Sequence, residues 1–125
     1  MGMDAQAIAN NDIALGSGAI ARGGSSLAWG IKLGDVAVEA IGHNSIAMGA
    51  GAIAKGQQSA SFGGGTIATR DRQFVIGQYN IEDTSKSYVH IIGFGGGESS
   101  RANIHTVDTS GNSWYKGDVY VGGTS

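Results

Sequence analysis

The sequence has no cysteine and no proline, and only 14% of its 125 residues are charged. Without cysteine, neither a disulfide framework nor a thiolate metal site can form. Without proline, no residue interrupts the hydrogen bonding of a ladder of strands. The 8 basic and 10 acidic residues are spread evenly and give a net charge of −2, which provides no charged surface for nucleic acid or for an anionic membrane.

The sequence also lacks a basic amino-terminal segment followed by an apolar core, so we expect neither a signal peptide nor a membrane span. Glycine and alanine are abundant instead. The 23 glycines have no Gly-X-Y period, which excludes collagen, and the 41% of hydrophobic residues argue against disorder. Much of the hydrophobic share is alanine, so a single chain of this length would have only a small core.

Glycine recurs at a fixed distance, which predicts a repeat architecture. The repeat glycines are Gly16, Gly30, Gly49, Gly63 and Gly77, spaced 14, 19, 14 and 14 residues apart. A helix is excluded because each glycine in its interior would cost about 1 kcal/mol. Two short strands and two tight turns per 14 residues predict one coil of a β-solenoid instead. Such coils stack about 4.8 Å apart.

Each predicted strand alternates side-chain size but not polarity. The three residues before each repeat glycine follow one order. The first is mostly bulky, the second is mostly small, and the third, next to the glycine, is bulky and apolar. Successive side chains point to opposite faces, so apolar residues would lie both inside and outside the coil. An outer apolar face needs another copy to cover it, and a cyclic homotrimer is the simplest closed arrangement, a dimer the next. The candidate trimer or core positions are Leu15, Ala47, Met48, Ile53, Phe62, Ile67 and Ile76, and Trp29 is also expected in the core.

Two coils depart from the period. The coil between Gly30 and Gly49 is five residues longer than its neighbours, and we expect the extra residues to loop outward on one exposed face. At the amino-terminal end, the segment Ala7-Ile8-Ala9 lies too close to Ile13 for the period. The first coil is therefore predicted to be irregular or incomplete.

A family resemblance follows from the repeat unit. The stretch Asn44-Ser45-Ile46-Ala47-Met48-Gly49, followed by Ala52-Ile53-Ala54-Lys55-Gly56, resembles the head repeat of YadA-like trimeric autotransporter adhesins. Residues 12–23 match the same motif, and residues 26–30 match its first half. The resemblance implies a trimeric, left-handed parallel β-roll over residues 4–80. Neither a neck motif nor the apolar heptads of a coiled-coil stalk follow it.

Residues 81–125 are predicted to form a separate β-rich module. Strands are expected at residues 88–92, 104–107, 114–115 and 119–121, with a glycine-rich loop at 93–100 and a hairpin turn at 109–112. Such a module would cap the solenoid, whose open strand edge would otherwise favour aggregation. This half of the chain resembles modules of phage and prophage tail fibres, some of which carry YadA-like rolls upstream.

The sequence offers no recognised arrangement of catalytic or cofactor-binding residues. The loop at residues 93–100 lacks the lysine of a phosphate-binding loop and does not open a helix, so a surface loop is preferred to a nucleotide site. No Gly-x-Ser-x-Gly elbow occurs. Glycoside cleavage would need two paired carboxylates. The acids Glu82, Asp83, Glu98, Asp108 and Asp118 show no such pairing, and we expect no enzyme, no catalytic residue and no cofactor.

The histidines His43, His90 and His105 have no metal-ligand spacing. In a trimer, three copies of His90 or His105 could surround the axis and hold a metal. Ordinary, partly buried or turn histidines are the preferred interpretation, and no metal site is predicted. Trp114 and Tyr115, beside the hairpin turn, are the candidates for a contact with a receptor.

These patterns predict an all-β protein that assembles as a homotrimeric rod. The resemblance of its carboxy-terminal half implies that this rod is a segment of a phage or prophage tail fibre. The segment would belong to the virion, act as a stiff spacer and contribute to host attachment. Its expected partners are copies of itself, neighbouring fibre segments, and a glycan or protein of the host surface, with no nucleic acid and no membrane. The alternative is the head domain of a trimeric autotransporter adhesin on the bacterial outer surface. An ice-binding solenoid is disfavoured because the outward rows are alanine and isoleucine with a single Thr66.

Overall fold

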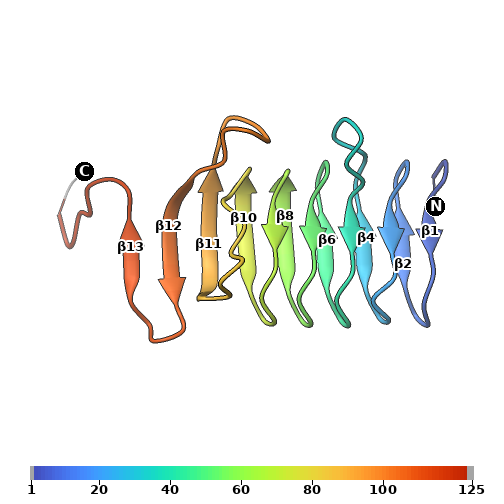
Figure 1. The fold of residues 1–125 in the computed structure, drawn as a ribbon, viewed down its shortest axis with the longest axis horizontal. Coiled ribbons are helices and arrows are strands. Elements are labelled where there is room, and N and C mark those ends of the chain that lie inside the picture. Colours follow the sequence, from blue (N-terminus) through green and yellow to red (C-terminus); the bar gives the residue numbers. More distant parts are fainter. Residues whose placement is uncertain (1, 124–125) are drawn as a thin grey trace.

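The structure is a computed structural model that describes residues 2–123, and these residues form strands and no helix. The strands are β1 (Gln6–Ala7), β2 (Ile13–Leu15), β3 (Ile20–Ala21), β4 (Leu27–Trp29), β5 (Glu39–Ala40), β6 (Ile46–Met48), β7 (Ile53–Ala54), β8 (Ala60–Gly64), β9 (Ile67–Ala68), β10 (Phe74–Gln78), β11 (Tyr88–Phe94), β12 (Asn103–Asp108) and β13 (Ser113–Tyr115). They form a parallel β-solenoid of about 6 turns with about 14 residues per coil (Figure 1), which confirms the predicted solenoid and its coil length. Within the described residues, no helix has the length and apolarity needed to cross a membrane.

The coils stack into two sheets that face each other. Sheet A contains β1, β3, β5, β7 and β9, and sheet B contains β2, β4, β6, β8, β10, β11, β12 and β13, each in this spatial order. From β2 to β11, neighbouring strands of sheet B are parallel and in register, so that Ala28 pairs with Ala14 on one side and with Ala47 on the other. One repeat of the sequence therefore forms one coil of the stack.

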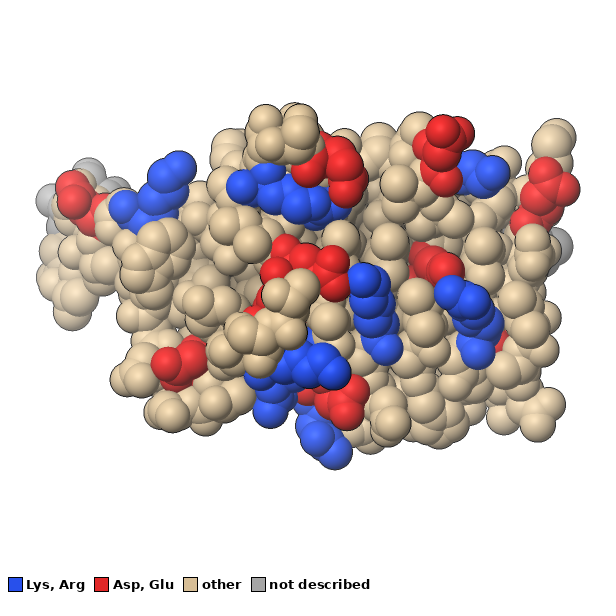
Figure 2. Space-filling view, in the orientation of Figure 1, with Lys and Arg blue, Asp and Glu red and all other residues tan. Residues whose placement is uncertain are grey.

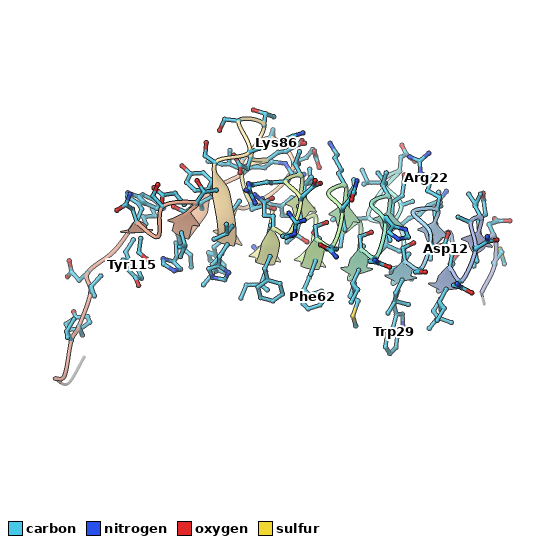
Figure 3. The ribbon with its side chains drawn as sticks, turned by 90° about the horizontal axis from the view of Figure 1, so that it is seen from below. Asp12, Arg22, Trp29, Phe62, Lys86 and Tyr115 are labelled. Carbon is cyan, nitrogen blue, oxygen red and sulfur yellow. The ribbon has the colours of Figure 1, made fainter. Side chains whose placement is uncertain are left out.

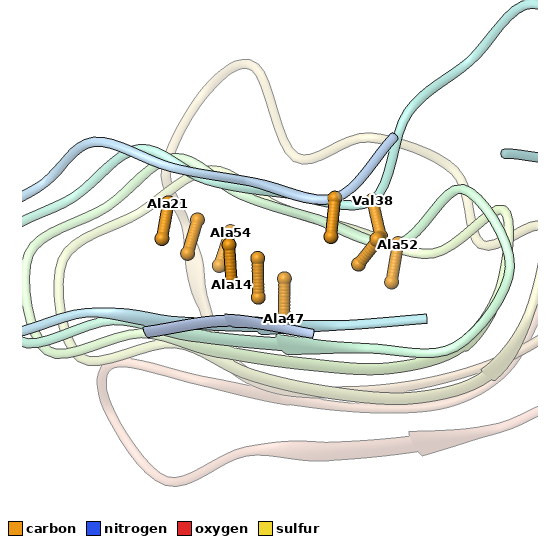
Figure 4. Close-up of a cluster of buried hydrophobic side chains, with 9 residues drawn as sticks. Ala14, Ala21, Val38, Ala47, Ala52 and Ala54 are labelled. Atoms are coloured by element: carbon orange, nitrogen blue, oxygen red, sulfur yellow. The ribbon is translucent and has the colours of Figure 1, made fainter. Parts of the chain in front are cut away.

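The space between the sheets accommodates only small side chains. The main core cluster consists of Ala14, Ala19, Ala21, Ala28, Val38, Ala40, Ala47, Ala52 and Ala54, which meet between the two layers of backbone (Figure 4). One coil further on, Ser61 and Thr66 replace alanines, and the Ser61 hydroxyl donates to Thr66 Oγ1 at 2.8 Å. The small residue of each sheet B strand thus points inward and its two larger neighbours point outward. The prediction that Trp29 lies in the core is wrong: the narrow interior cannot hold an indole, and Trp29 is 52% exposed on the outer side.

The repeat glycines lie at or near the ends of the sheet B strands, and this corner of the coil has no room for a side chain. Gly63 has a φ of +124°, which favours glycine. A Cβ on Gly63 would also overlap the carbonyl oxygen of Gly77 in the next coil, and a Cβ on Gly77 would overlap that of Gly93. Backbones of successive coils therefore touch directly at this corner.

Sheet A ends at β9, where side-chain amides complete the hydrogen bonding of the last strand. Asn80 Oδ1 accepts from the Ile67 N–H at 2.8 Å, and Asn80 Nδ2 donates to the Ile67 carbonyl at 3.1 Å, as the peptide groups of a further strand would. Gln73 Oε1 accepts from the Thr69 N–H at 2.9 Å. Both amide side chains are buried. They close an edge that would otherwise be open to pairing.

Beyond β10 the chain adds strands to sheet B alone. β11 pairs in parallel with β10, so the stack continues past residue 80, the boundary predicted between the two parts of the chain. β12 and β13 are antiparallel additions that lie beside β11 and lengthen sheet B (Figure 1). The strands expected near residues 88–92, 104–107 and 114–115 are confirmed, and β11 extends into the expected loop. Residues 119–121 form no strand, in contrast to the prediction.

The structure confirms the prediction for the coil between Gly30 and Gly49 more fully than the prediction for the first coil. The longer coil does contain an outward loop, which projects beyond the sheets between β4 and β5 and contains an antiparallel bridge between Leu33 and Val36 (Figure 1). The first coil is in register rather than irregular, because β1 pairs with β3 and Gln6 lies beside Ile20. It is incomplete, as predicted, because among the described residues no strand of sheet B precedes β1. The counterpart of the later strands is therefore Ala5-Gln6-Ala7 and not Ala7-Ile8-Ala9.

We expect Gly63→Ala to lower the free energy of unfolding by at least about 2 kcal/mol, because the methyl group meets a backbone carbonyl and the positive φ strains alanine. Gly64→Ala is a matched control, since nothing lies within 4 Å of the position that its Cβ would occupy. Thermal unfolding followed by circular dichroism should show a clear fall in melting temperature for Gly63→Ala only. Equal melting temperatures in the two variants would contradict the backbone contact at this corner.

Candidate interaction surface

The outer side of sheet B is lined with large apolar side chains along the length of the solenoid. We call this surface the apolar face and define it by two rows, which are Ile13, Leu27, Ile46, Ala60 and Phe74, and Leu15, Trp29, Met48, Phe62 and Ile76. Figure 3 shows Trp29 and Phe62 projecting from the same side of the ribbon. Ile13, Trp29 and Phe74 are 53%, 52% and 39% exposed. A single chain therefore leaves a long, continuous apolar surface in contact with solvent.

The outer side of sheet A is different because charges interrupt its apolar positions. Arg22 forms an ion pair with Glu39 at 2.9 Å, and Lys55 forms one with Glu82 at 2.8 Å. Burial alone would raise the pKa of Glu82, but hydrogen bonds from Lys55 and Thr69 and the charge of Lys55 lower it below the ordinary value. Figure 2 shows this face with Lys, Arg, Asp and Glu along the rod, and Figure 3 places Arg22 opposite Trp29. Among the described residues, the two rows of the apolar face contain no charged side chain, whereas ion pairs lie on the outer side of sheet A.

A row of stacked rings continues the apolar face onto the carboxy-terminal strands. Phe62 meets Phe74 edge to face with ring centroids 5.5 Å apart, and Phe74 stacks on His90 at 5.8 Å. His90 then contacts His105 at 5.4 Å, and His105 stacks on Tyr115 at 4.3 Å. The five rings come from β8, β10, β11, β12 and β13. The apolar face and this ring row together cover the outer side of sheet B from end to end.

His90 and His105 lie side by side in the ring row. Within residues 2–123, no group of three His, Cys, Asp or Glu side chains is arranged to hold a metal ion. Burial disfavours the charged form of His90, and the neighbouring His105 adds repulsion. Both effects lower the pKa of His90 from its ordinary 6.5. His90 is therefore a neutral ring of the surface at physiological pH.

The structure separates the candidate positions into three environments. Leu15, Met48, Phe62 and Ile76 lie on the apolar face, Ile53 and Ile67 lie on the outer side of sheet A, and Ala47 is inside the solenoid. Trp114 and Tyr115 are not brought together. Tyr115 pairs with His105 on the outer side of sheet B, whereas Trp114 pairs with Thr106, which is buried on the inner side.

Most of the acids considered for catalysis take part in holding the fold together. Glu82 binds Lys55, and Glu98 forms an ion pair with Arg101 at 3.0 Å. Asp83 is buried and accepts from the N–H groups of Ser87 and Tyr88. Asp108 closes the hairpin turn by accepting from the N–H groups of Ser110 and Asn112. Glu82, Asp83 and Asp108 thus have structural contacts, whereas Glu98 is largely exposed and, among the described residues, pairs only with Arg101.

Sequence reasoning missed the part played by β11. The triplet Ile91-Ile92-Gly93 repeats Val75-Ile76-Gly77, and the two triplets pair residue for residue. Their spacing of 16 residues hid a match that the residue types themselves carry. Asn80 and Gln73 were also missed, because a side chain that replaces a strand has no periodic signal.

Comparison of the chain with protein-family models, with curated proteins and with solved structures finds no match. Its functional assignment therefore depends on its own residues and geometry.

We predict that stability falls as the pH drops below about 6.5, the pKa of an unperturbed histidine. The lowered pKa of His90 means that the unfolded chain takes up a proton before the folded chain does, so stability is present above 6.5 and is lost as the pH falls toward the folded pKa. His90→Phe keeps a ring beside Phe74 but cannot be protonated. The fall in melting temperature between pH 7.5 and pH 5 should be smaller in this variant, and an equal fall would contradict the assignment.

Proposed function

We propose that the chain is a rigid rod segment of a homotrimeric fibre, of the kind found in the tail fibres of phages and prophages, and that it takes part in host attachment. The observation that carries this proposal is the uncharged apolar face on one side of the solenoid only. Apolar patches of this extent on a soluble protein mark a surface that another molecule covers. The ion pairs of sheet A suit the side that remains in water.

A second copy of the same chain is the partner that fits this surface best. Two copies have the same spacing between coils, so rows of side chains from one copy can pack between those of the other along the whole rod. The face is long and repeats in one direction, which favours a parallel arrangement around an axis. Three copies around such an axis form a closed assembly in which no apolar face remains uncovered, and a two-fold dimer is the alternative.

The tail-fibre context follows from the resemblance of both halves of the chain and from the mechanical character of the fold. Every coil is hydrogen-bonded to the next along sheet B, and the described residues contain no helix or long unstructured linker between β1 and β11. Such a stack transmits force along its axis without a hinge. A head domain of a bacterial surface adhesin has the same mechanical requirement, and tail-assembly genes beside the full gene would favour the fibre.

We expect the wild-type chain to have three times its monomer mass by light scattering at micromolar concentration. Met48→Asp places a carboxylate in the middle of the apolar face, where assembly would bury one uncompensated charge per chain. This variant should dissociate to monomers. Ile53→Asp is the matched comparison on the outer side of sheet A and should retain the trimeric mass.

The pair of variants locates the interface as well as testing it. Dissociation by Ile53→Asp but not by Met48→Asp would place the contact on sheet A and overturn the proposed surface. A wild-type monomer with intact β-sheet circular dichroism would overturn the assembly itself. If Met48→Asp unfolds, dilution of the wild-type chain gives an independent readout, because loss of mass on dilution should accompany exposure of Trp29.

A further inference from the structure

The inner side of sheet B opens into a pocket at the carboxy-terminal end of the solenoid. Sheet A stops at β9, so no strand lies opposite β12 and β13. The pocket has a volume of about 420 Å³, and its lining includes Tyr88, Asn103, Thr106, Asp108, Asn112 and Trp114. This volume is within the range of roughly 300–1,000 Å³ that is typical of small-molecule sites. The same side of the same sheet is filled by alanine further along the solenoid.

Trp114 provides the flat apolar surface of this pocket. It lies on the edge strand β13 and is 50% exposed, whereas its pairing partner Thr106 is only 4% exposed. Tyr88 contributes a second aromatic side chain to the lining. A half-exposed indole beside a pocket is suited to stacking against an apolar ring face. The neighbouring Tyr115 belongs to the opposite side and stacks on His105.

The polar groups around Trp114 are held in place and include unused hydrogen-bonding capacity. Asp108 accepts from the N–H groups of Ser110 and Asn112 at 2.9 Å and from Asn112 Nδ2 at 3.1 Å, which fixes its carboxylate. These hydrogen bonds lower the pKa of Asp108 below its ordinary value, and the one from the Asn112 N–H has the largest effect. Asn103 Oδ1 accepts from the Ile81 N–H at 2.9 Å. Its Nδ2 donors and the Thr106 hydroxyl have no partner among residues 2–123 and are available to a ligand.

The charge of the lining limits the class of ligand. Within the described part of the chain, no lysine or arginine lines the pocket, so a phosphate or an acidic sugar would find no counter-ion there. The lining combines an indole, a phenol, two side-chain amides, two aliphatic hydroxyls, one carboxylate and one aliphatic side chain. Amides and hydroxyls both donate and accept, as the hydroxyl groups of a sugar ring do. This combination matches a neutral sugar better than an anion or a purely apolar molecule.

We propose that this pocket binds a neutral monosaccharide unit of a glycan, with the apolar face of the sugar ring on Trp114 and its hydroxyl groups bonded to Thr106, Asn103 and Asp108. The inference deepens the proposed attachment role and rests on it for its biological meaning. The pocket and the apolar face lie on opposite sides of sheet B. Glycan binding and assembly are therefore separate properties that can be measured independently.

Isothermal titration calorimetry on the intact chain tests the site, with methyl glycosides of glucose, galactose and N-acetylglucosamine as neutral probes and choline as a cationic probe. At least one neutral glycoside should bind saturably. Trp114→Ala should weaken that binding at least about tenfold, which is about 1.4 kcal/mol. Thr106→Val keeps the shape but removes the hydroxyl, and should weaken it about fivefold or more. Tyr115→Ala, a change of similar exposure on the opposite side of the same strand, should leave binding unchanged.

Three results would overturn the proposal: no binding of any neutral glycoside, equal loss in Trp114→Ala and Tyr115→Ala, or preference for choline over every glycoside. Melting temperatures show whether each variant is folded. If Trp114→Ala does not fold, the near-isosteric Thr106→Val still tests the site. Light scattering on the same samples separates the two functions. Failure of glycan binding with a trimeric mass would leave assembly intact, whereas a monomer that binds sugar would overturn assembly and retain the pocket.

Discussion

The small separation between the two sheets is the constraint on which the rest of this structure depends. All but one of the residues in the main core cluster are alanine, so the sheets approach each other until little more than a methyl group fits between them. Larger side chains on the same strands must then point outward. At the corner of each coil the backbones touch, and glycine is required there. The unusual glycine and alanine content of the chain is a direct result of this geometry.

A narrow interior limits how much a single chain contributes to its own stability. Fully burying a large aliphatic side chain stabilises by about 1.5–3 kcal/mol, and alanine offers only a fraction of that area. The hydrogen bonds between coils are local, since each coil contacts only its neighbours. The largest apolar side chains, such as Trp29 and Phe62, are on the outside. In the proposed assembly these residues supply the apolar burial that the interior of one chain lacks, which would couple folding to association.

The sequence predicts that the chain forms coils, but it does not predict which side chains of each strand face the interior. Regular spacing of glycine identified the solenoid because stacked backbones need glycine at the same place in every coil. The alternation of large and small residues did not show which of them faces inward, since either choice satisfies a period of two. The answer depends on the distance between two sheets, which no single strand encodes, and Trp29 was misplaced for this reason. The strand of the first coil was not recognised because Gln6, a polar residue, occupies the outward position that isoleucine has in β3.

Only the part of the candidate surface that belongs to the repeat was predictable from the sequence. Met48, Phe62 and Ile76 were recognised through the repeat, and the structure places them on one surface. The pocket beside Trp114 lies outside the repeat. Its residues are brought together by antiparallel pairing and by the turn that Asp108 closes, and neither feature is periodic. Adjacent positions in the sequence suggested that Trp114 and Tyr115 act together, but successive residues of a strand face opposite ways.

Asn80 closes one end of sheet A. In a stack of identical coils, order can begin anywhere and spread to neighbours in both directions. In sheet A this spreading stops at β9, because the Asn80 amide occupies the donor and acceptor of Ile67 that a following strand would use. Asn80 thus occupies, at the end of sheet A, the place that the backbone of a further coil would take. The two sheets therefore end at different heights of the stack, because sheet B continues through β10, β11, β12 and β13 beyond the last strand of sheet A.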